Sequence, residues 1–587
     1  MEQRTPIADV RVNHSFSGLL IVPRGRDHRA VKEIIGGLAP GVEMRRHTDG
    51  LEVTDLAAIA KLADKSPSCL AWHADALRFA QNRKRRMNSA QQAREAVTVL
   101  KTGGLPAAEG ATLDLPGKGI LDGHQLLNVA LMTVPDGDGL CVFDEQGAGK
   151  TVTFIFAFDL LVQRDEIDVA LIVAPKSMVP EWPRDIARFK ADIYKTAILS
   201  GSRERKMHTL RKGADILITN FETAVSMESE LRTFLQRYSG RAAIAVDESF
   251  FIKNREAQRT QALRRLREWC RRAYVLCGTP APNAPHDLVE QFNFVDFGTT
   301  FSGINIPEDR DQARPIIQAA IEGSGSYIRH LKADVLPDLL GKVFHRVNVP
   351  LAPQQQEIYS AILQDLIAEL ERTSDVEFKK RISSFLARQM ALLQACSNPA
   401  SLVEDYAETP SKLLALDELL GEIVARRREK VVLWSFFTRS IDAIASRYSQ
   451  FNPVRYDGTI TSVEERRSAV QRFQEDDSTM LFVANPAAAG AGLTLHRSKY
   501  AIYESMSNQA AHYLQSLDRI HRRGQTRGVE YLILLSDKTI EVQEFDRLQQ
   551  KERSAQMLLG DQVNPPATRE VMLSELRASA ASLWGAE

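Results

Sequence analysis

The sequence predicts an α/β protein with two parallel-sheet lobes, a helical insertion and a small N-terminal accessory domain. The chain has 587 residues, enough for about four folding units. Two regions alternate short β-rich segments with helical patterns, which is typical of parallel sheets covered by helices on both faces. Between them, residues 353–396 place apolar side chains at helical spacing without intervening strands.

The composition is that of a folded protein rather than a disordered or fibrous one. Hydrophobic residues make up 44% of the chain and charged residues 26%. Lys plus Arg number 75 and so do Asp plus Glu, so any nucleic-acid site must be a local patch. The N-terminus is charged and no apolar run is long enough to span a bilayer. We expect no membrane partner and a cytoplasmic location, nucleoid-associated in a bacterium or nuclear in a eukaryote.

Residues 1–110 are expected to form the accessory domain, because they mix short apolar runs with helical segments and contain no recognisable chemical motif. The following Gly- and Pro-rich stretch, residues 102–119, predicts a linker or long loop. A basic cluster lies inside the accessory domain and consists of Arg83, Lys84, Arg85 and Arg86. It is either a DNA-contacting helix or an ordinary solvated face.

The remaining boundaries follow the change in pattern along the chain. We expect the first lobe at 111–300, the helical insertion at 301–408, the second lobe at 409–560 and a C-terminal tail at 561–587. The apolar ladder within 358–370 is interpreted as core packing. The arginine-rich run 255–272 joins two predicted strands, so a solvated helix is favoured over a DNA contact.

A phosphate-binding loop is expected at residues 144–151, DEQGAGKT, where a predicted strand turns into a helix. Gly147 and Gly149 would let backbone N–H groups approach the β-phosphate. Lys150 would reach the β and γ oxygens, and the Thr151 hydroxyl would ligate Mg²⁺. Asp144 stands where the strict phosphate-loop pattern has glycine, so the pattern alone leaves a Gly-rich turn as the alternative.

Two acids at the end of another predicted strand complete this candidate site. Asp247 and Glu248 follow the apolar segment 243–246. Asp247 would hold Mg²⁺ through water, and Glu248 would orient and polarise the attacking water. The alternative is that they cap a helix after a buried strand. Together with the phosphate loop they favour hydrolysis of a nucleotide.

Taken in order, the motifs resemble those of the SWI/SNF-related helicase-like ATPases of superfamily two, from about Leu121 to Lys551. In the first part of the chain they are LDGHQ at 121–125, DEQGAGKT at 144–151, APKS at 174–177, ITNFE at 218–222, DESFFIKN at 247–254, GTP at 278–280 and RHLK at 329–332. In the second part they are WSF at 434–436, YDG at 456–458, AAGAGLTL at 488–495 and QSLDRIHRRGQ at 515–525.

The resemblance implies two RecA-like lobes that use ATP and Mg²⁺ and act on double-stranded DNA. It implies that Gln125 reads adenine and that Arg519 and Arg522 are arginine fingers to the γ-phosphate; these two lie on one face if the segment is helical. A solvated basic helix end is the alternative. The further nucleotide-binding residues would be Gly147, Ala148, Gly149, Lys150, Thr151 and Gly492, and the nucleic-acid contacts would be Lys176, Ser177, Asn220, Ser435 and Thr494.

The sequence departs from the family pattern at two places. Phe250 replaces a histidine that helps couple hydrolysis to DNA movement, while both acids before it remain. The segment 504–509 lacks the aromatic residue expected before the closing motif. Hydrolysis is therefore expected, and coupling is the open question.

The function predicted from the sequence is that of a DNA-dependent ATPase that moves along duplex DNA and displaces bound proteins or remodels DNA structures. One alternative is a strand-separating DNA or RNA helicase. Another is a nucleotide-switched scaffold in a larger nucleic-acid-processing or phage-defence complex. A protein partner could bind through the N-terminal domain, and the sequence leaves the oligomeric state open.

Overall fold

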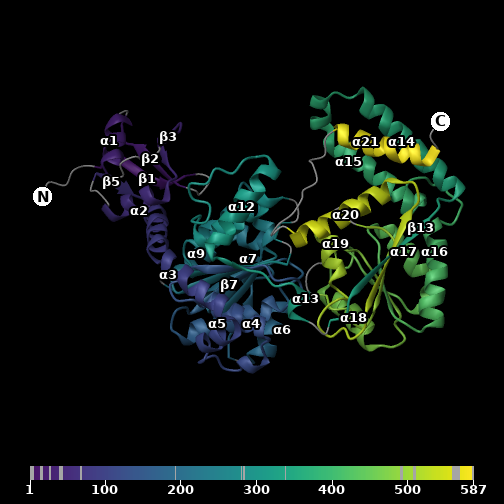
Figure 1. Ribbon diagram of the computed structural model, residues 1–587, viewed down its shortest axis with the longest axis horizontal. Helices are drawn as coiled ribbons and strands as arrows, with labels where there is room; N and C mark the ends of the chain where they lie inside the picture. Colours follow the sequence, from purple (N-terminus) through teal and green to yellow (C-terminus); the bar gives the residue numbers. More distant parts are fainter. Residues whose placement is uncertain are drawn as a thin grey trace. The chain divides into compact units, whose positions relative to one another are not determined.

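The computed structural model describes the whole chain except residues 1–5, 14–17, 26–27, 39–41, 43, 66–68, 192, 239, 279, 282–283, 337–338, 489–492, 507–509, 558–568 and 585–587. The described residues form three sheets in two compact units, which meet in the chain between Leu331 and Lys332 (Figure 1). No described helix is both long and apolar enough to cross a membrane.

The first unit begins with a five-stranded sheet of order β3-β4-β2-β1-β5. Its strands are β1 (Ala8–Val12), β2 (Leu19–Pro23), β3 (Met44–Arg46), β4 (Leu51–Val53) and β5 (Leu70–Trp72). Alternate strand residues such as Val10, Ile21 and Val53 are buried against α1 (His28–Leu38) and α2 (Leu56–Lys65). This period of two is what a sheet with one covered face requires. We call residues 6–72 the N-terminal module.

A long helix, α3 (Ala74–Ala111), leads from this module into the first lobe. The predicted linker at 102–119 is therefore wrong over its first ten residues, 102–111. The Gly and Pro residues are accommodated by a local kink, because Gly104 takes a left-handed φ of 57°. Pro106 then lies in the first turn after the kink, where its missing N–H has no helical partner to lose.

The first lobe is a seven-stranded, all-parallel sheet of order β12-β6-β11-β10-β7-β9-β8. Its strands are β6 (Gly139–Val142), β7 (Val169–Ala174), β8 (Thr196–Ile198), β9 (Ile216–Asn220), β10 (Ala242–Asp247), β11 (Arg272–Leu276) and β12 (Tyr327–Ile328). Both faces are buried, which explains why the strands read as continuous apolar runs.

Helices cover the two faces of this sheet in two groups (Figure 1). One core is closed by α3, α4 (Gly123–Met132), α5 (Lys150–Gln163) and α6 (Glu181–Phe189). The other is closed by α7 (Arg203–Lys212), α8 (Phe221–Ser226), α9 (Glu228–Gln236), α10 (Gln258–Arg267), α11 (Val289–Asp296) and α12 (Arg310–Ser324). Because α12 and β12 pack within this lobe, the predicted start of the helical insertion at residue 301 is wrong.

The second unit carries a six-stranded parallel sheet of order β13-β18-β17-β14-β16-β15. The strands are β13 (Lys342–Val349), β14 (Val431–Trp434), β15 (Val454–Tyr456), β16 (Leu481–Ala484), β17 (Tyr500–Tyr503) and β18 (Val529–Ser536). The helices of this lobe are α13 (Lys332–Val335), α16 (Ser411–Leu420), α17 (Thr438–Arg447), α18 (Val463–Glu475), α19 (Ala510–Leu517) and α20 (Ile540–Met557). A π-helical turn, Gly421–Arg426, follows α16. The predicted α/β fold class is confirmed by the parallel sheets of the two lobes.

The helical insertion consists of α14 (Pro353–Arg372) and α15 (Asp375–Ser397). The interpretation of the ladder at 358–370 as core is confirmed, because Leu363, Leu366 and Leu370 are fully buried. The predicted tail contains a further helix, α21 (Arg569–Trp584), which packs on α14 through Leu576. It is therefore part of this helical layer.

Candidate functional site

The phosphate loop lies between β6 and the N-terminus of α5, as the sequence predicts. Gly147 and Gly149 have φ values of 89° and 92°, which side chains with a Cβ rarely adopt. A Cβ on Gly149 would also lie 2.2 Å from the Gln125 amide nitrogen. The loop therefore needs glycine at this position for space as well as for conformation, and it leads directly into a helix N-terminus that favours an anion.

Lys150 is the first residue of α5, and its ammonium is held within the loop. Its Nζ donates to the carbonyl oxygens of Asp144 at 2.8 Å and Glu145 at 3.3 Å. Thr151 follows in the first turn of α5 and is half-buried. Ala148 is buried, and its carbonyl accepts hydrogen bonds from Gln125 and His124.

Asp144, the residue that departs from the strict phosphate-loop pattern, anchors the loop. Its buried carboxylate accepts hydrogen bonds from Asn128 Nδ2 at 2.5 Å, and from the backbone N–H and Nδ1 of His330 at 2.9 Å each. Sequence reasoning missed these partners, although His330 belongs to the RHLK motif. The acid thus ties the loop to α4 and to the end of β12.

Gln125 lies against the phosphate loop in the first turn of α4. Its Oε1 accepts from the Asp122 N–H at 3.0 Å, and its Nε2 donates to the Ala148 carbonyl at 3.0 Å. The first bond is one half of a capping box at the start of α4, and the second joins α4 to the phosphate loop. Recognition of adenine by Gln125 stays a prediction.

Asp247 and Glu248 lie at the carboxyl end of β10, between β7 and β11. Asp247 accepts hydrogen bonds from Trp182 Nε1 at 3.1 Å and from the Glu248 N–H at 3.0 Å. Burial raises the pKa of Asp247 above its ordinary value, and the Trp182 hydrogen bond and the charge of Lys150 offset this only in part. A cation beside Asp247 would favour its charged form.

Glu248 is buried and has a left-handed backbone, with φ of 52° and ψ of 56°. Such a conformation costs a residue with a Cβ about 1–3 kcal/mol and is concentrated at functional sites. Its Oε1 accepts a hydrogen bond of 2.6 Å from Gln146 Nε2, which comes from the phosphate loop itself. No sequence pattern pointed to Gln146, since its position in the phosphate-loop pattern is unrestricted.

The segment after β11 closes this arrangement from another side. A Cβ on Gly278 would lie 2.7 Å from Gln146 Cγ and 3.4 Å from Lys150 Nζ. Two residues of the same motif neighbourhood, Thr279 and Asn283, lie outside the described residues. Phe250 stacks on Phe251 with ring centroids 4.6 Å apart, so its side chain joins an apolar cluster. The first lobe therefore brings the predicted lysine and both acids into one neighbourhood.

Arg519 and Arg522 lie in the second unit, in irregular turns after α19. The condition under which they would share a helix face is not met, because α19 ends at Leu517. They nevertheless converge, since Nη1 of each donates to the Leu493 carbonyl, at 3.5 Å for Arg519 and 2.9 Å for Arg522. The predicted nucleotide ligand Gly492, one residue earlier, lies outside the described residues.

The predicted nucleic-acid contacts differ in how available they are. Lys176 is exposed and Ser177 is half-buried at the end of β7. Asn220 caps α8 by accepting from the Thr223 N–H, and Thr494 is half-buried. Ser435 is fully buried and donates to Glu504 Oε2 at 2.7 Å, so the prediction that it contacts nucleic acid is wrong for this structure. Glu504 opens the segment that lacks the family's aromatic residue.

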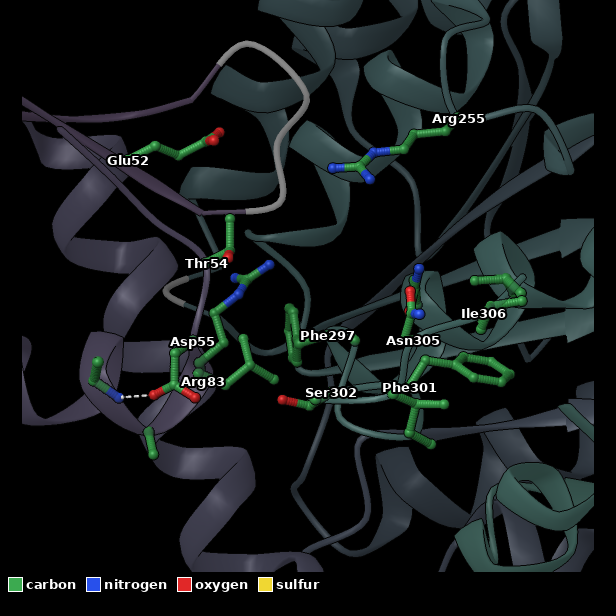
Figure 2. A pocket seen from close by; sticks show the side chains of 18 of the residues that line it. Glu52, Thr54, Asp55, Arg83, Arg255, Phe297, Phe301, Ser302, Asn305 and Ile306 are labelled. Carbon is green, nitrogen blue, oxygen red and sulfur yellow. Dashed lines mark hydrogen bonds between the residues drawn. The ribbon is translucent and has the colours of Figure 1, made fainter. Parts of the chain in front are cut away.

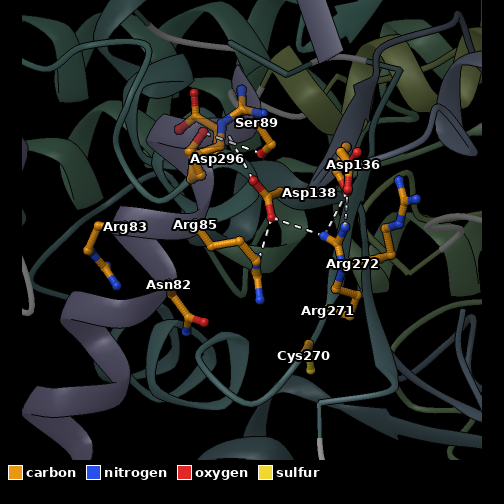
Figure 3. A network of polar contacts seen from close by, with 12 residues as sticks. Asn82, Arg83, Arg85, Ser89, Asp136, Asp138, Cys270, Arg271, Arg272 and Asp296 are labelled. Atoms are coloured by element: carbon orange, nitrogen blue, oxygen red, sulfur yellow. Dashed lines mark hydrogen bonds and ion pairs between the residues drawn. The ribbon is translucent and has the colours of Figure 1, made fainter. Parts of the chain in front are cut away.

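The basic cluster of α3 is mostly internal (Figure 3). Arg83 is 3% exposed and donates to Glu268 at 2.5 Å, and Asn82 donates to the other oxygen of that carboxylate at 2.7 Å. Arg86 is buried with its Nε 3.6 Å from Asp138. The prediction of a DNA-contacting face is therefore wrong for Arg83 and Arg86.

The other two members of the cluster also have acidic partners. Arg85 donates to Asp138 at 3.1 Å, and Lys84 pairs with Asp64 on α2. Asp138 is nearly inaccessible and also receives Arg271 at 3.3 Å. Figure 3 shows Arg85 and Arg271 converging on this carboxylate. The three arginines thus fasten α3 to the first lobe, and Lys84 fastens it to α2 of the N-terminal module.

Three of the seven arginines in the run 255–272 are buried, so the prediction of a solvated helix is wrong for Arg264, Arg267 and Arg272, whereas Arg259 is exposed. Arg264 is buried against Glu290 at 3.1 Å. Arg267 donates to four backbone carbonyls, including those of Phe294 and Cys270. Arg272 pairs with Glu166 at 2.5 Å. These arginines hold the loops around the sheet.

A cleft of about 1020 Å³ lies between the N-terminal module and the first lobe (Figure 2). Arg45 and Glu52 line it from the module, and Arg255 and Asn305 line it from the lobe. Its lining combines both signs of charge. Arg83 also borders it, but this guanidinium is already paired with Glu268.

The sequence of this chain matches the models of two known protein families. Residues 76–401 match the model of the SNF2-related domain. The chain belongs to the SNF2-related family of helicase-like ATPases. Residues 411–524 of this SNF2-related chain match the helicase conserved C-terminal domain. The SNF2-related match begins within α3, so this helix belongs to the family domain, and the resemblance inferred from the motifs is confirmed.

The curated relatives of this SNF2-related chain are longer proteins. It is similar to "ISWI chromatin-remodeling complex ATPase ISW1" of Saccharomyces cerevisiae, with 28% identity over 480 residues that cover 75% of this chain and 41% of that protein. It is also similar to "SWI/SNF-related matrix-associated actin-dependent regulator of chromatin subfamily A member 1" of Homo sapiens, with 24% identity over 499 residues and coverage of 78% and 46%. The chain thus spans less than half the length of these two relatives.

A solved structure, "Sulfolobus solfataricus SWI2/SNF2 ATPase core in complex with dsDNA", matches at 20% identity and a TM-score of 0.35. The match covers 76% of this chain and 97% of that one.

Proposed function

We propose that this protein is a DNA-dependent ATPase that moves along duplex DNA and remodels what is bound to it. The observation that supports this most is the grouping of Lys150, Asp247 and Glu248 around one phosphate loop within a SNF2-related domain. The two curated relatives described above are named as a chromatin-remodelling ATPase and as a regulator of chromatin.

The reaction we propose is in-line attack of water on the γ-phosphate of ATP. The backbone of Gly147 to Thr151 binds the phosphates at the N-terminus of α5. Lys150 exchanges its two carbonyl partners for phosphate oxygens, which is a short movement of a flexible side chain. Glu248 accepts the proton of the attacking water.

The residues present fit a magnesium ion beside this loop. Asp247 is a buried carboxylate whose pKa is raised by burial, so it is suited to a cation that offsets the cost of its charge. Thr151 and Asp247 would hold Mg²⁺, which when bound neutralises charge on the phosphate oxygens.

Arg519 and Arg522 complete the site from the second unit when the two lobes close. An arginine finger typically contributes on the order of 10³–10⁵ in rate. Their shared contact with the Leu493 carbonyl keeps the two guanidinium groups together before that step.

We propose that the protein binds DNA through contacts to the phosphate backbone of the DNA. Such contacts depend on charge and carry little sequence information. Lys176 and Ser177 are the accessible candidates in the first lobe. The N-terminal module is proposed to select a partner, and the mixed charges of its cleft favour a protein surface over a polyanion.

Turnover of ATP with and without duplex DNA tests the proposal, with displacement of a third strand from a triplex as the readout of movement. We expect duplex DNA to stimulate turnover and the third strand to be released without separation of a forked duplex. A rate of ATP hydrolysis that duplex DNA does not change would contradict a motor and favour the nucleotide-switched scaffold, the alternative to which Phe250 in place of the family's histidine points.

A further inference from the structure

The RHLK segment, residues 329–332, contacts functional elements on both sides of the boundary between the units. In the first unit, His330 binds Asp144 through its backbone N–H and its ring, and its carbonyl accepts from the Glu145 N–H at 3.1 Å. The phosphate loop is therefore fastened to this segment at its first two residues. The chain enters the second unit at Lys332, only two residues after His330.

Lys332 is buried and binds the turn that carries the two arginines. Its Nζ donates to Asp518 Oδ1 at 2.6 Å and to the His521 carbonyl at 2.9 Å. Asp518 immediately precedes Arg519, and His521 immediately precedes Arg522. One ammonium thus holds the residue before each arginine.

Further contacts of this turn, which lies beyond the end of α19, involve its backbone and the ring of His521. The Arg519 carbonyl accepts from the Leu495 N–H at 2.9 Å, and His521 Nε2 contacts the Leu340 carbonyl at 2.8 Å. Burial and the charge of Lys342 lower the pKa of His521 to about 4, so its ring is neutral at pH 7 and can donate this hydrogen bond. Because the His521 ring is neutral, it does not act as a cation for Asp518. Lys332 is the cation that pairs with Asp518 at hydrogen-bond distance.

The electrostatics of the pair agree with a functional anchor. Burial acts to raise the pKa of Asp518, but the charges of Lys332 and Lys342 outweigh it and hold the pKa below its ordinary value. Asp518 is therefore a carboxylate that accepts a charge-assisted hydrogen bond. Lys332 is buried and Asp518 is half-buried, so the pair is only partly screened by solvent.

We propose that Lys332 is a positioning residue for the arginine pair: it orders the Asp518–His521 turn so that Arg519 and Arg522 take the geometry that ATP hydrolysis needs. This inference rests on the proposed function.

The test is the steady-state ATPase of the full chain with Lys332→Met, which keeps the length of the side chain and removes its charge. We expect kcat to fall about a hundredfold, a fraction of the loss typical of a missing arginine finger. The Kd for a fluorescent ATP analogue should change by less than about threefold, because the phosphate loop lies in the other unit. An unchanged kcat would overturn the proposal, and so would equal losses in kcat and in binding.

Lys342→Met is the matched control. Lys342 Nζ lies 3.8 Å from the same Asp518 oxygen, beyond hydrogen-bond distance. We expect its kcat to stay within about threefold of wild type, since a general change of charge near Asp518 leaves the anchor in place. A control as slow as Lys332→Met would overturn the specific role of Lys332.

Two further variants make the result decisive. The double variant Lys332→Met/Arg519→Ala should have a kcat less than about threefold below that of Arg519→Ala alone. The effects of residues that act as a unit are not additive. Lys332→Met with Asp518→Asn removes both charges of the pair and should be folded by circular dichroism and still slow. Two outcomes would show that Lys332 has only a structural role and would overturn the proposal. One is a folded Lys332→Met/Asp518→Asn variant with wild-type kcat, and the other is loss of folding in both this variant and Lys332→Met.

Failure of the inference can be told apart from failure of the proposed function. A slow Arg519→Ala enzyme with a fast Lys332→Met enzyme would refute only the role of Lys332. Wild-type turnover in Arg519→Ala would refute the role of the arginine itself.

Discussion

The ion pair between Arg83 and Glu268 gives the sharpest test of how α3 is attached to the first lobe. Both side chains are nearly inaccessible, and their closest atoms are 2.5 Å apart. Removing one partner of a buried pair typically costs about 3–5 kcal/mol. Asn82 would still donate to Glu268 at 2.7 Å, so we expect Arg83→Met to lower the free energy of unfolding by about 3 kcal/mol, the lower end of that range.

Urea unfolding followed by tryptophan fluorescence measures this change. Trp269 adjoins Glu268, and the guanidinium of Arg78 lies 3.9 Å from the centre of its ring, so its emission reports on the attachment. The control is Lys84→Met, next in the sequence, because Lys84 pairs with the exposed Asp64. We expect this control to cost at most about 1 kcal/mol, the usual range for surface ion pairs.

The same variants decide between the two interpretations of the basic cluster. If Arg83 is structural, Arg83→Met lowers stability and leaves the DNA affinity of the folded protein unchanged. A variant with wild-type stability and weakened, less salt-dependent DNA binding would refute this reasoning and restore Arg83 as a phosphate contact.

Four further predictions concern the site and the N-terminal module. Lys150→Ala should lose hydrolysis and weaken ATP binding, whereas Glu248→Gln should bind ATP and lose about 10²–10⁴ in kcat, because its amide cannot accept the proton of water; filter binding and phosphate release measure the two. Gly278→Ala should lower kcat by about a hundredfold, because its Cβ would lie 2.7 Å from Gln146 Cγ and displace the side chain that holds Glu248. The apparent affinity for duplex DNA should fall with salt with a log–log slope of about −4.5 if about five phosphates are neutralised. Deletion of residues 1–72 should leave basal ATPase largely intact, whereas deletion of 1–110 should unfold the first lobe, because it leaves Glu268 and Asp138 without their partners on α3.

Each of these has an outcome that would contradict it. Near wild-type turnover in Glu248→Gln would remove this residue from the chemistry, and a fast Gly278→Ala enzyme would show that the loop has room at this point. A DNA affinity independent of salt would exclude tracking along the backbone. A folded, active 1–110 deletion would show that the pairs on α3 are dispensable.

Local sequence predicted those parts of the site that depend on neighbouring residues. Lys150 and Asp247 could be placed because a phosphate loop and a strand-end acid each have a short pattern with a physical reason. The side chain that holds Glu248, Gln146, could not be predicted, because the pattern leaves its position open.

The errors concern residues whose partners are distant in the sequence. From its sequence neighbours alone, Arg83 resembles a solvated basic residue. Its acidic partner, Glu268, lies 185 residues away in the sequence. The predicted domain boundary at residue 301 was wrong because β12 pairs with β6, which lies far before it in the sequence, and so belongs to the first lobe. The linker at 102–119 failed because a single left-handed glycine, Gly104, lets the helix resume before Pro106.

The attachment of α3 has a practical consequence for measuring lobe motion. Of the five cysteines, Cys141, Cys270, Cys277 and Cys396 are buried, whereas Cys69 is half-exposed beside β5 in the N-terminal module. A thiol-reactive dye would therefore label the native protein selectively at Cys69. Because buried ion pairs join α3 to the first lobe, that dye reports the position of the ATP-binding lobe, and a second fluorophore on the helicase C-terminal domain would follow each closing event in real time.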